Sequence, residues 1–232
     1  GKDLPAWGAS DPLLRPARRR SAAKCRTLGA LFPYPDRSWY MEANSQYREI
    51  RRLGSASQLV EDSAGSLLVL REEGPSPRAA VKWDKLSGGS EGLPPLLSQD
   101  AGGLIRPYIR GGALSDEVQG RFFHEQEVRR LADGLLVILG KIHSSGLVHG
   151  AIKLGNVIMD SESRRIWLVD PSPAPEGGAK EDLSSLAGLV AALMLPYAPA
   201  SSRDLDMLPL RWQCWLDLLI GGKAESAEQA RE

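Results

Sequence analysis

The chain has 232 residues, of which 42% are hydrophobic and 25% are charged, and its 29 basic residues (Lys and Arg) equal its 29 acidic ones. This composition suits one globular domain, in one or two lobes. A net charge of zero gives no general attraction to nucleic acid, and no apolar run reaches the roughly 20 residues that span a bilayer. Cys25 and Cys214 lie far apart without metal-ligating neighbours, so we expect free thiols in a reducing, cytoplasmic environment.

Residues 1–44 carry several prolines and a basic cluster at Arg15–Arg20, and they show neither helical nor strand periodicity. A segment of this kind does not bury enough apolar surface to fix one conformation. We therefore expect an extended or partly disordered N-terminal arm. We interpret the arginine cluster as a solvated tail rather than as a binding patch.

Three short β-prone segments follow, at 47–54, 66–70 and 79–83, with polar or glycine-containing turns between them. Short strands joined by such turns predict an antiparallel meander. The next segment, 83–103, is rich in glycine and proline, so we expect no full-length helix in it. Residues 104–114 then predict a strand, an extended linker and a Gly-Gly turn.

Helical patterns dominate the second half of the chain. From 117 to 144 apolar residues recur at spacings of three and four, which predicts a long helix that stops at Gly146, with a break near Gly120 or Gly134. Residues 181–194 predict a strongly apolar helix with an acidic start, and 212–230 predict the last helices.

A polar loop lies between apolar segments at Leu147–Asp160. The short apolar runs at 157–159 and 166–169 predict a β-hairpin, which would bring Lys153, Asn156 and Asp170 to one edge. An amine, an amide oxygen and a carboxylate in one place suit a magnesium-bound phosphate, because the hard cation takes oxygen ligands.

This stretch resembles the catalytic loop of eukaryotic-like protein kinases, H-R-D-x-K-x-x-N, which is followed about fourteen residues later by the Asp of the D-F-G element. Here the loop reads HGAIKLGN from His149 to Asn156, and DPS begins at Asp170. The resemblance implies that Asn156 and Asp170 bind Mg²⁺, and that Lys153 neutralises the transferred phosphoryl group.

Two positions of the loop depart from the kinase pattern. Gly150 replaces the Arg that reads a phosphorylated activation loop, and Ala151 occupies the position of the catalytic Asp, the base for the substrate hydroxyl. Only 11 residues separate Asp170 from Asp182, which is too few for a long activation loop. The resemblance also implies that Asp182 anchors the backbone of the catalytic loop.

The resemblance further implies an ATP site made by residues upstream of the loop. Taken alone, Lys82 would be an ordinary surface lysine; beside the catalytic loop, it resembles the strand lysine that holds the α- and β-phosphates. The other residues of the implied site are Gly54, Ser55 and Ala56 in a degenerate glycine-rich loop, Glu91 as the acidic partner of Lys82, and Tyr108 and Ile109 beside the adenine.

We therefore predict an α+β chain with a two-lobe protein-kinase-like fold, in a stripped form that resembles bacterial effector kinases. The expected parts are the arm at 1–44, an N-lobe and hinge at 45–110, and a C-lobe at 111–232. The N-lobe would be a small antiparallel β lobe with a reduced helix αC. The C-lobe would be mainly helical, with a very short activation segment.

The leading hypothesis for function is an ATP- and magnesium-dependent protein Ser/Thr kinase of the minimal effector type, in a form made inactive by Ala151. Its partner would be a protein with a Ser or Thr acceptor, such as a host protein met after secretion into a host cell. One alternative is a natural pseudokinase that binds a nucleotide or a partner. Another is an aminoglycoside-kinase-like phosphotransferase, because those enzymes also use His-Gly at this position of the loop. No nucleic acid or membrane span is expected, and the oligomeric state is left open.

Overall fold

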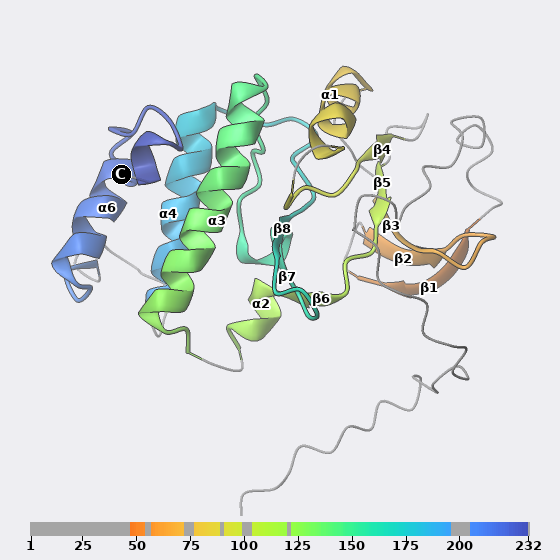
Figure 1. The fold of residues 1–232 in the computed structure, drawn as a ribbon, viewed down its shortest axis with the longest axis horizontal. Helices are drawn as coiled ribbons and strands as arrows, with labels where there is room; N and C mark the ends of the chain where they lie inside the picture. The colour runs from red at the N-terminus through yellow and green to blue at the C-terminus, as the bar shows by residue number, and fades with distance from the viewer. Residues whose placement is uncertain are drawn as a thin grey trace, which may run out of the picture. The chain divides into compact units, whose positions relative to one another are not determined.

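Two antiparallel sheets and a group of packed helices make up the fold (Figure 1). The computed structural model describes residues 47–53, 57–71, 77–88, 91–98, 104–119, 122–195 and 205–231, all of which belong to one compact unit. The predicted arm at 1–44 and the predicted loop residues Gly54, Ser55 and Ala56 lie outside these ranges. Within them, no helix is both long enough and apolar enough to cross a membrane.

The first sheet has the strand order β1-β2-β3-β5-β4, and each neighbouring pair is antiparallel. Its strands are β1 (Arg48–Arg52), β2 (Ser57–Glu61), β3 (Leu67–Arg71), β4 (Leu97–Ser98) and β5 (Leu104–Pro107). The strands predicted from 47, 66 and 104 are confirmed. β2 was not predicted as a strand, because Leu59 and Val60 are its only apolar residues.

The two faces of this sheet have different environments. On one face lies a small apolar cluster of Val60, Leu68 and Ile105. On the other face, the register pairs Val69 with Arg106. It also pairs Arg71 with Leu104. Directly paired residues share a face, and so do residues two apart in a strand. Arg71 and Arg106 therefore lie on the same face, as diagonal neighbours.

Helix α1 (Pro77–Ser87) replaces the strand that we predicted at 79–83, so that prediction was wrong. Its buried residues Ala80, Trp83 and Ser87 are three and four positions apart, the spacing of one helix face. Five apolar-rich residues are too few to separate the two periods, whereas Pro77 at the first helical position favours a helix. With 11 residues, α1 is the reduced helix of the expected β lobe, and the Gly/Pro-rich stretch follows it.

The second sheet has the order β6-β7-β8 and contains the predicted hairpin, which is confirmed. Its strands are β6 (Gly111–Ala113), β7 (Val157–Asp160) and β8 (Ile166–Leu168). We predicted a turn at Gly111–Ala113, but these residues pair with β7 as a strand. Glycine is required at position 111, because a Cβ there would lie 2.1 Å from the carbonyl oxygen of Met159.

The helices pack beside this second sheet, with α4 between α3 and α6 (Figure 1). They are α2 (Leu114–Glu117), α3 (Glu125–Ser144), α4 (Ala179–Met194) and α6 (Leu210–Ile220), with 3-10 turns η3 (Leu154–Asn156) and η4 (Gln229–Arg231). The helix predicted over 117–144 begins only at Glu125, as α3, and α2 shares only Glu117 with the predicted range. α3 runs unbroken through Gly134, where Ile166 packs so closely that a Cβ would lie 2.8 Å from its Cδ1.

Candidate nucleotide and metal site

The loop that resembles a catalytic loop runs from the end of α3 to β7, and Asp182 of α4 holds its backbone. One carboxylate oxygen of Asp182 accepts the N–H of His149 at 2.8 Å, and the other accepts the N–H of Gly150 at 2.8 Å. The ring Nε2 of His143 lies 2.9 Å from the same carboxylate. Asp182 is buried, so these contacts replace its lost hydration. The anchoring role expected for Asp182 is confirmed.

His149 is a packing residue of this loop. Its ring is fully buried and meets Trp83 of α1 edge-on, with ring centroids 6.0 Å apart. Burial lowers the pKa of His149 to about 4, against the opposing charges of Asp182 and Asp170. The imidazole is therefore neutral near pH 7 and ties α1 to the loop by contact rather than by charge. The ring of His143, by contrast, contacts the Asp182 carboxylate.

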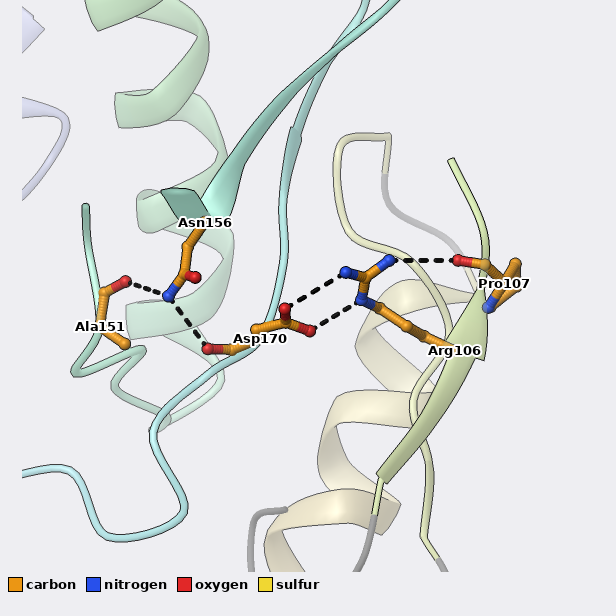
Figure 2. Close-up of polar contacts among 5 residues, drawn as sticks. All are labelled: Arg106, Pro107, Ala151, Asn156 and Asp170. Atoms are coloured by element: carbon orange, nitrogen blue, oxygen red, sulfur yellow. Dashed lines mark hydrogen bonds and ion pairs between the residues drawn. The ribbon is translucent and has the colours of Figure 1, made fainter. Parts of the chain in front are cut away.

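Asn156 joins the loop to Asp170. Its Nδ2 donates to the carbonyl oxygens of Ala151 at 2.8 Å and of Asp170 at 3.3 Å (Figure 2). The carbonyl oxygen of Asn156 also accepts the N–H of Val169 at 2.9 Å. Both side-chain bonds use Nδ2, so Oδ1 is the atom that would face a metal ion. The structure thus brings Asn156 and Asp170 together, as the sequence predicted, and places Ala151 beside them; among the described residues, no hydrogen bond or ion pair joins the side chain of Lys153 to this group.

Asp170 is paired with an arginine that sequence reasoning missed. Nε of Arg106 lies 2.7 Å from Oδ1 of Asp170, and Nη2 lies 3.2 Å from Oδ2, so the guanidinium uses both oxygens (Figure 2). The side chains are only 5% and 13% exposed. A bidentate pair of this kind is among the strong charge-assisted contacts in proteins. The signal in the sequence that could have indicated this ion pair is the arginine within the otherwise apolar strand β5, which reads LIRP.

Magnesium does not fit Asp170 in this arrangement. The ion requires carboxylate oxygens, and both oxygens of Asp170 already accept hydrogen bonds from Arg106. In the described part of the chain, no group of three or more His, Cys, Asp or Glu residues could hold a metal. A metal ion on the Asp170 carboxylate would have to displace Arg106. The guanidinium of Arg106, which is nearly buried, would then lose its counter-charge.

A second arginine stands where the third strand of a kinase carries its phosphate-binding lysine. Arg71 ends β3, and its buried Nη1 has no hydrogen-bond partner among the described residues. Burial is the main cause of the lowered pKa of His149, and the charge of Arg71 makes a minor contribution in the same direction. We assigned this lysine role to Lys82, but Lys82 lies on α1, where its side chain is exposed. The prediction that Lys82 is a strand lysine that holds phosphates is therefore not supported by its position on a helix.

The remaining predicted residues lie in several places. Glu91 is 77% exposed in a turn and pairs with Arg165 at 3.2 Å, rather than with Lys82. Lys153 is exposed just before η3. Tyr108 and Ile109 follow β5, and the N–H of Tyr108 still donates to the carbonyl oxygen of Leu67 at 3.0 Å. Their proximity to an adenine stays a prediction.

The short segment after Asp170 packs directly on the catalytic loop. The N–H of Ser172 donates to the carbonyl oxygen of His149 at 2.8 Å. Gly150 has a φ of +67°, and a Cβ on it would lie 2.6 Å from Cβ of Pro175. A side chain is excluded at 150 by both strain and space. Packing by this segment therefore accounts for the missing Arg.

Comparisons with known proteins agree with this architecture. The kinase domain of Mycobacterium tuberculosis PknI is 17% identical and matches with a TM-score of 0.64, over 80% of this chain and 94% of that one. The kinase PK-1 of Cydia pomonella granulovirus is 14% identical, with a TM-score of 0.62 over 80% of this chain and 93% of that one. The chain therefore has the protein-kinase-like fold, and the predicted α+β fold class is confirmed.

Sequence similarity is more limited in extent. The probable serine/threonine-protein kinase mkcC of Dictyostelium discoideum is 34% identical over 74 residues, which are 32% of this chain and 8% of that protein. No protein-family profile matches the chain.

Proposed function

We propose that this chain is a pseudokinase, a domain with the protein-kinase-like fold that binds a ligand or a partner without transferring phosphate. The observation that carries the proposal is the buried ion pair between Arg106 and Asp170, next to Ala151 in place of the base. Each of these two features removes a separate requirement of phosphoryl transfer.

The first requirement is a proton acceptor for the attacking hydroxyl. In protein kinases the loop Asp takes this role, and a positioned general base typically contributes about 10²–10⁴-fold in rate. Ala151 has only a methyl group, which accepts no proton. The backbone of this loop is nevertheless ordered by Asp182 and Asn156, so the loss is confined to the side chain.

The second requirement is a metal ion on the D-F-G carboxylate. Here a guanidinium occupies both oxygens of Asp170. Removing one partner of a buried ion pair costs about 3–5 kcal/mol, because the other charge is left uncompensated. A magnesium ion could bind the Asp170 carboxylate only if its binding free energy also covered the cost of breaking this ion pair. The site is therefore blocked by a residue outside the catalytic loop.

A second candidate is a protein Ser/Thr kinase that is silent only because Ala replaces the base. It is supported by the retained geometry of Asn156, whose Nδ2 fixes the backbone of Asp170 while Oδ1 is left for a metal. On this reading, restoring Asp at 151 is sufficient for transfer to a protein substrate. The aminoglycoside-kinase alternative rested on Gly150, which the packing of Pro175 explains without it.

Four proteins separate the two candidates: the parent, Ala151→Asp, Arg106→Met, and the double variant. Each is incubated with radiolabelled ATP, Mg²⁺ and a library of Ser- and Thr-containing peptides, and Asp170→Asn on the double variant serves as the background control. We expect no labelling by the parent or by Ala151→Asp. Labelling by Ala151→Asp alone would establish the second candidate, and labelling by the parent would refute the pseudokinase.

A further inference from the structure

We infer that Arg71 binds the phosphoryl groups of a nucleotide without a divalent metal, on the face of the first sheet that also carries Arg106. The inference rests on the proposed function and names the ligand chemistry of the same site. In this arrangement a protein cation takes the place that a metal ion has in an active kinase.

The first observation is the unused donor of Arg71. Its Nη1 is buried and has no hydrogen-bond partner among the described residues. An arginine is always charged in proteins, and a buried N–H without a partner costs stability. Such groups are rare in native structures, and an unfilled ligand position is one physical reason for them. A phosphate oxygen is the acceptor that matches a guanidinium best.

The second observation is the placement of two cations side by side. Arg71 and Arg106 are diagonal neighbours on one face of the sheet, through the pairings with Leu104 and Val69. Long side chains at diagonal positions are within reach of each other, and like charges repel unless they are compensated. Asp170 compensates Arg106. Nothing comparable compensates Nη1 of Arg71 in the part of the chain that the structure describes.

The third observation is the balance of charge around the loop. An active kinase carries a base Asp, a metal Asp and one Lys here, so its carboxylates need magnesium before a polyphosphate can approach. In this chain Ala151 removes one carboxylate and Arg106 compensates Asp170, so the charge of Arg71 on the same face of the sheet is left over. Asp182 is turned to His143 and to the backbone of His149 and Gly150. The site therefore attracts a phosphate anion without help from a metal.

The experiment measures binding by calorimetry with three probes, ATP, tripolyphosphate and adenosine, each in EDTA and in Mg²⁺. We expect ATP to bind with the same affinity in both buffers. Tripolyphosphate tests the phosphoryl contacts alone, and adenosine tests the base alone. Arg71→Gln should weaken ATP binding by about 10- to 100-fold, the usual effect of one charge-assisted hydrogen bond. Arg71→Lys should retain part of the affinity.

The matched control is Arg130→Gln, which removes the same charge from an exposed position on α3. It should bind ATP as the parent does. A stability measurement on the unliganded proteins distinguishes a binding role from a structural one. If Arg71 is an uncompensated binding group, Arg71→Gln without ligand should be at least as stable as the parent, although it binds less well.

Three results would overturn the inference: ATP binding that requires Mg²⁺, Arg71→Gln binding equal to that of the parent, or no binding of ATP and tripolyphosphate. The radiolabel assay reads phosphoryl transfer separately, so a failure of this inference alone would leave the parent and Ala151→Asp without labelling. Phosphoryl transfer by the parent would instead refute the proposed pseudokinase, and the calorimetry would still decide whether Arg71 binds phosphate.

Discussion

The ion pair between Arg106 and Asp170 should be a strongly coupled element of stability. Both side chains are nearly buried, and two hydrogen bonds of 2.7 and 3.2 Å join them. Replacing Arg106 by Met leaves a carboxylate without its counter-charge, and Asp170→Asn leaves a buried guanidinium in the same condition. Each single change should cost about 3–5 kcal/mol, because a lone buried charge is strongly unfavourable. The free energy of unfolding of a native domain is about 5–15 kcal/mol, so either single change would remove a large part of it.

The double variant Arg106→Met/Asp170→Asn removes both charges and should be close to the parent in stability. Asn is chosen at 170 because this residue has a φ of +60°, a conformation that Asn tolerates better than most residues. The free energy of unfolding is measured by equilibrium denaturation, followed by circular dichroism, for all four members of the cycle. Single changes that cost little and simply add in the double variant would refute the reasoning, since the pair would then be neither desolvated nor coupled.

Two further predictions concern the catalytic loop. Gly150→Ala should destabilise the fold by about 1–3 kcal/mol, because position 150 has a positive φ and Pro175 fills the space of a Cβ. Gly155→Ala, where the nearest atom is 3.9 Å away, is the control in the same denaturation assay, and an equal loss in both would contradict this reason. Burial lowers the pKa of His149 to about 4, so between about pH 6.5 and 4 the unfolded chain binds more protons, and stability falls as the pH falls, by up to about 3 kcal/mol. His149→Phe keeps a ring against Trp83, and its denaturation midpoint should depend less on pH over this range than that of the parent. An equal pH dependence in both proteins would assign the effect to other titratable groups.

The catalytic loop could be predicted from the sequence because its signals are local. Asn156 and Asp170 stand at fixed spacing on either side of a hairpin, and the hairpin is visible as two short apolar runs. Asp182 opens a strongly apolar helix, and its carboxylate does hold the loop. The residues of this loop are close in sequence or joined by one hairpin, so their spacing in the sequence was enough to predict that Asn156 and Asp170 lie together.

The β lobe could not be predicted as well, because its signals are weak and its contacts are distant in sequence. The run AAVKW fits a strand or a helix, and only the burial of Ala80, Trp83 and Ser87 on one face distinguishes them. A strand at this run places the predicted phosphate-binding residue at Lys82, whereas the third strand of the structure ends at Arg71. The pairing of Arg106 with Asp170 spans 64 residues, and no local pattern announces it.

The departures from the kinase pattern support one another, and this favours a pseudokinase over a kinase with a single changed residue. A base at position 151 would be of no use while Arg106 holds Asp170, since the transferred phosphoryl group would lack its metal. Arg106 in turn lies on the sheet face that carries Arg71, where a lysine would stand in an active kinase. Gly150 is fixed independently by Pro175. Positions 151 and 106, on two separate elements, would thus both have to change to rebuild a phosphotransferase, and a single substitution at 151 explains only one of them.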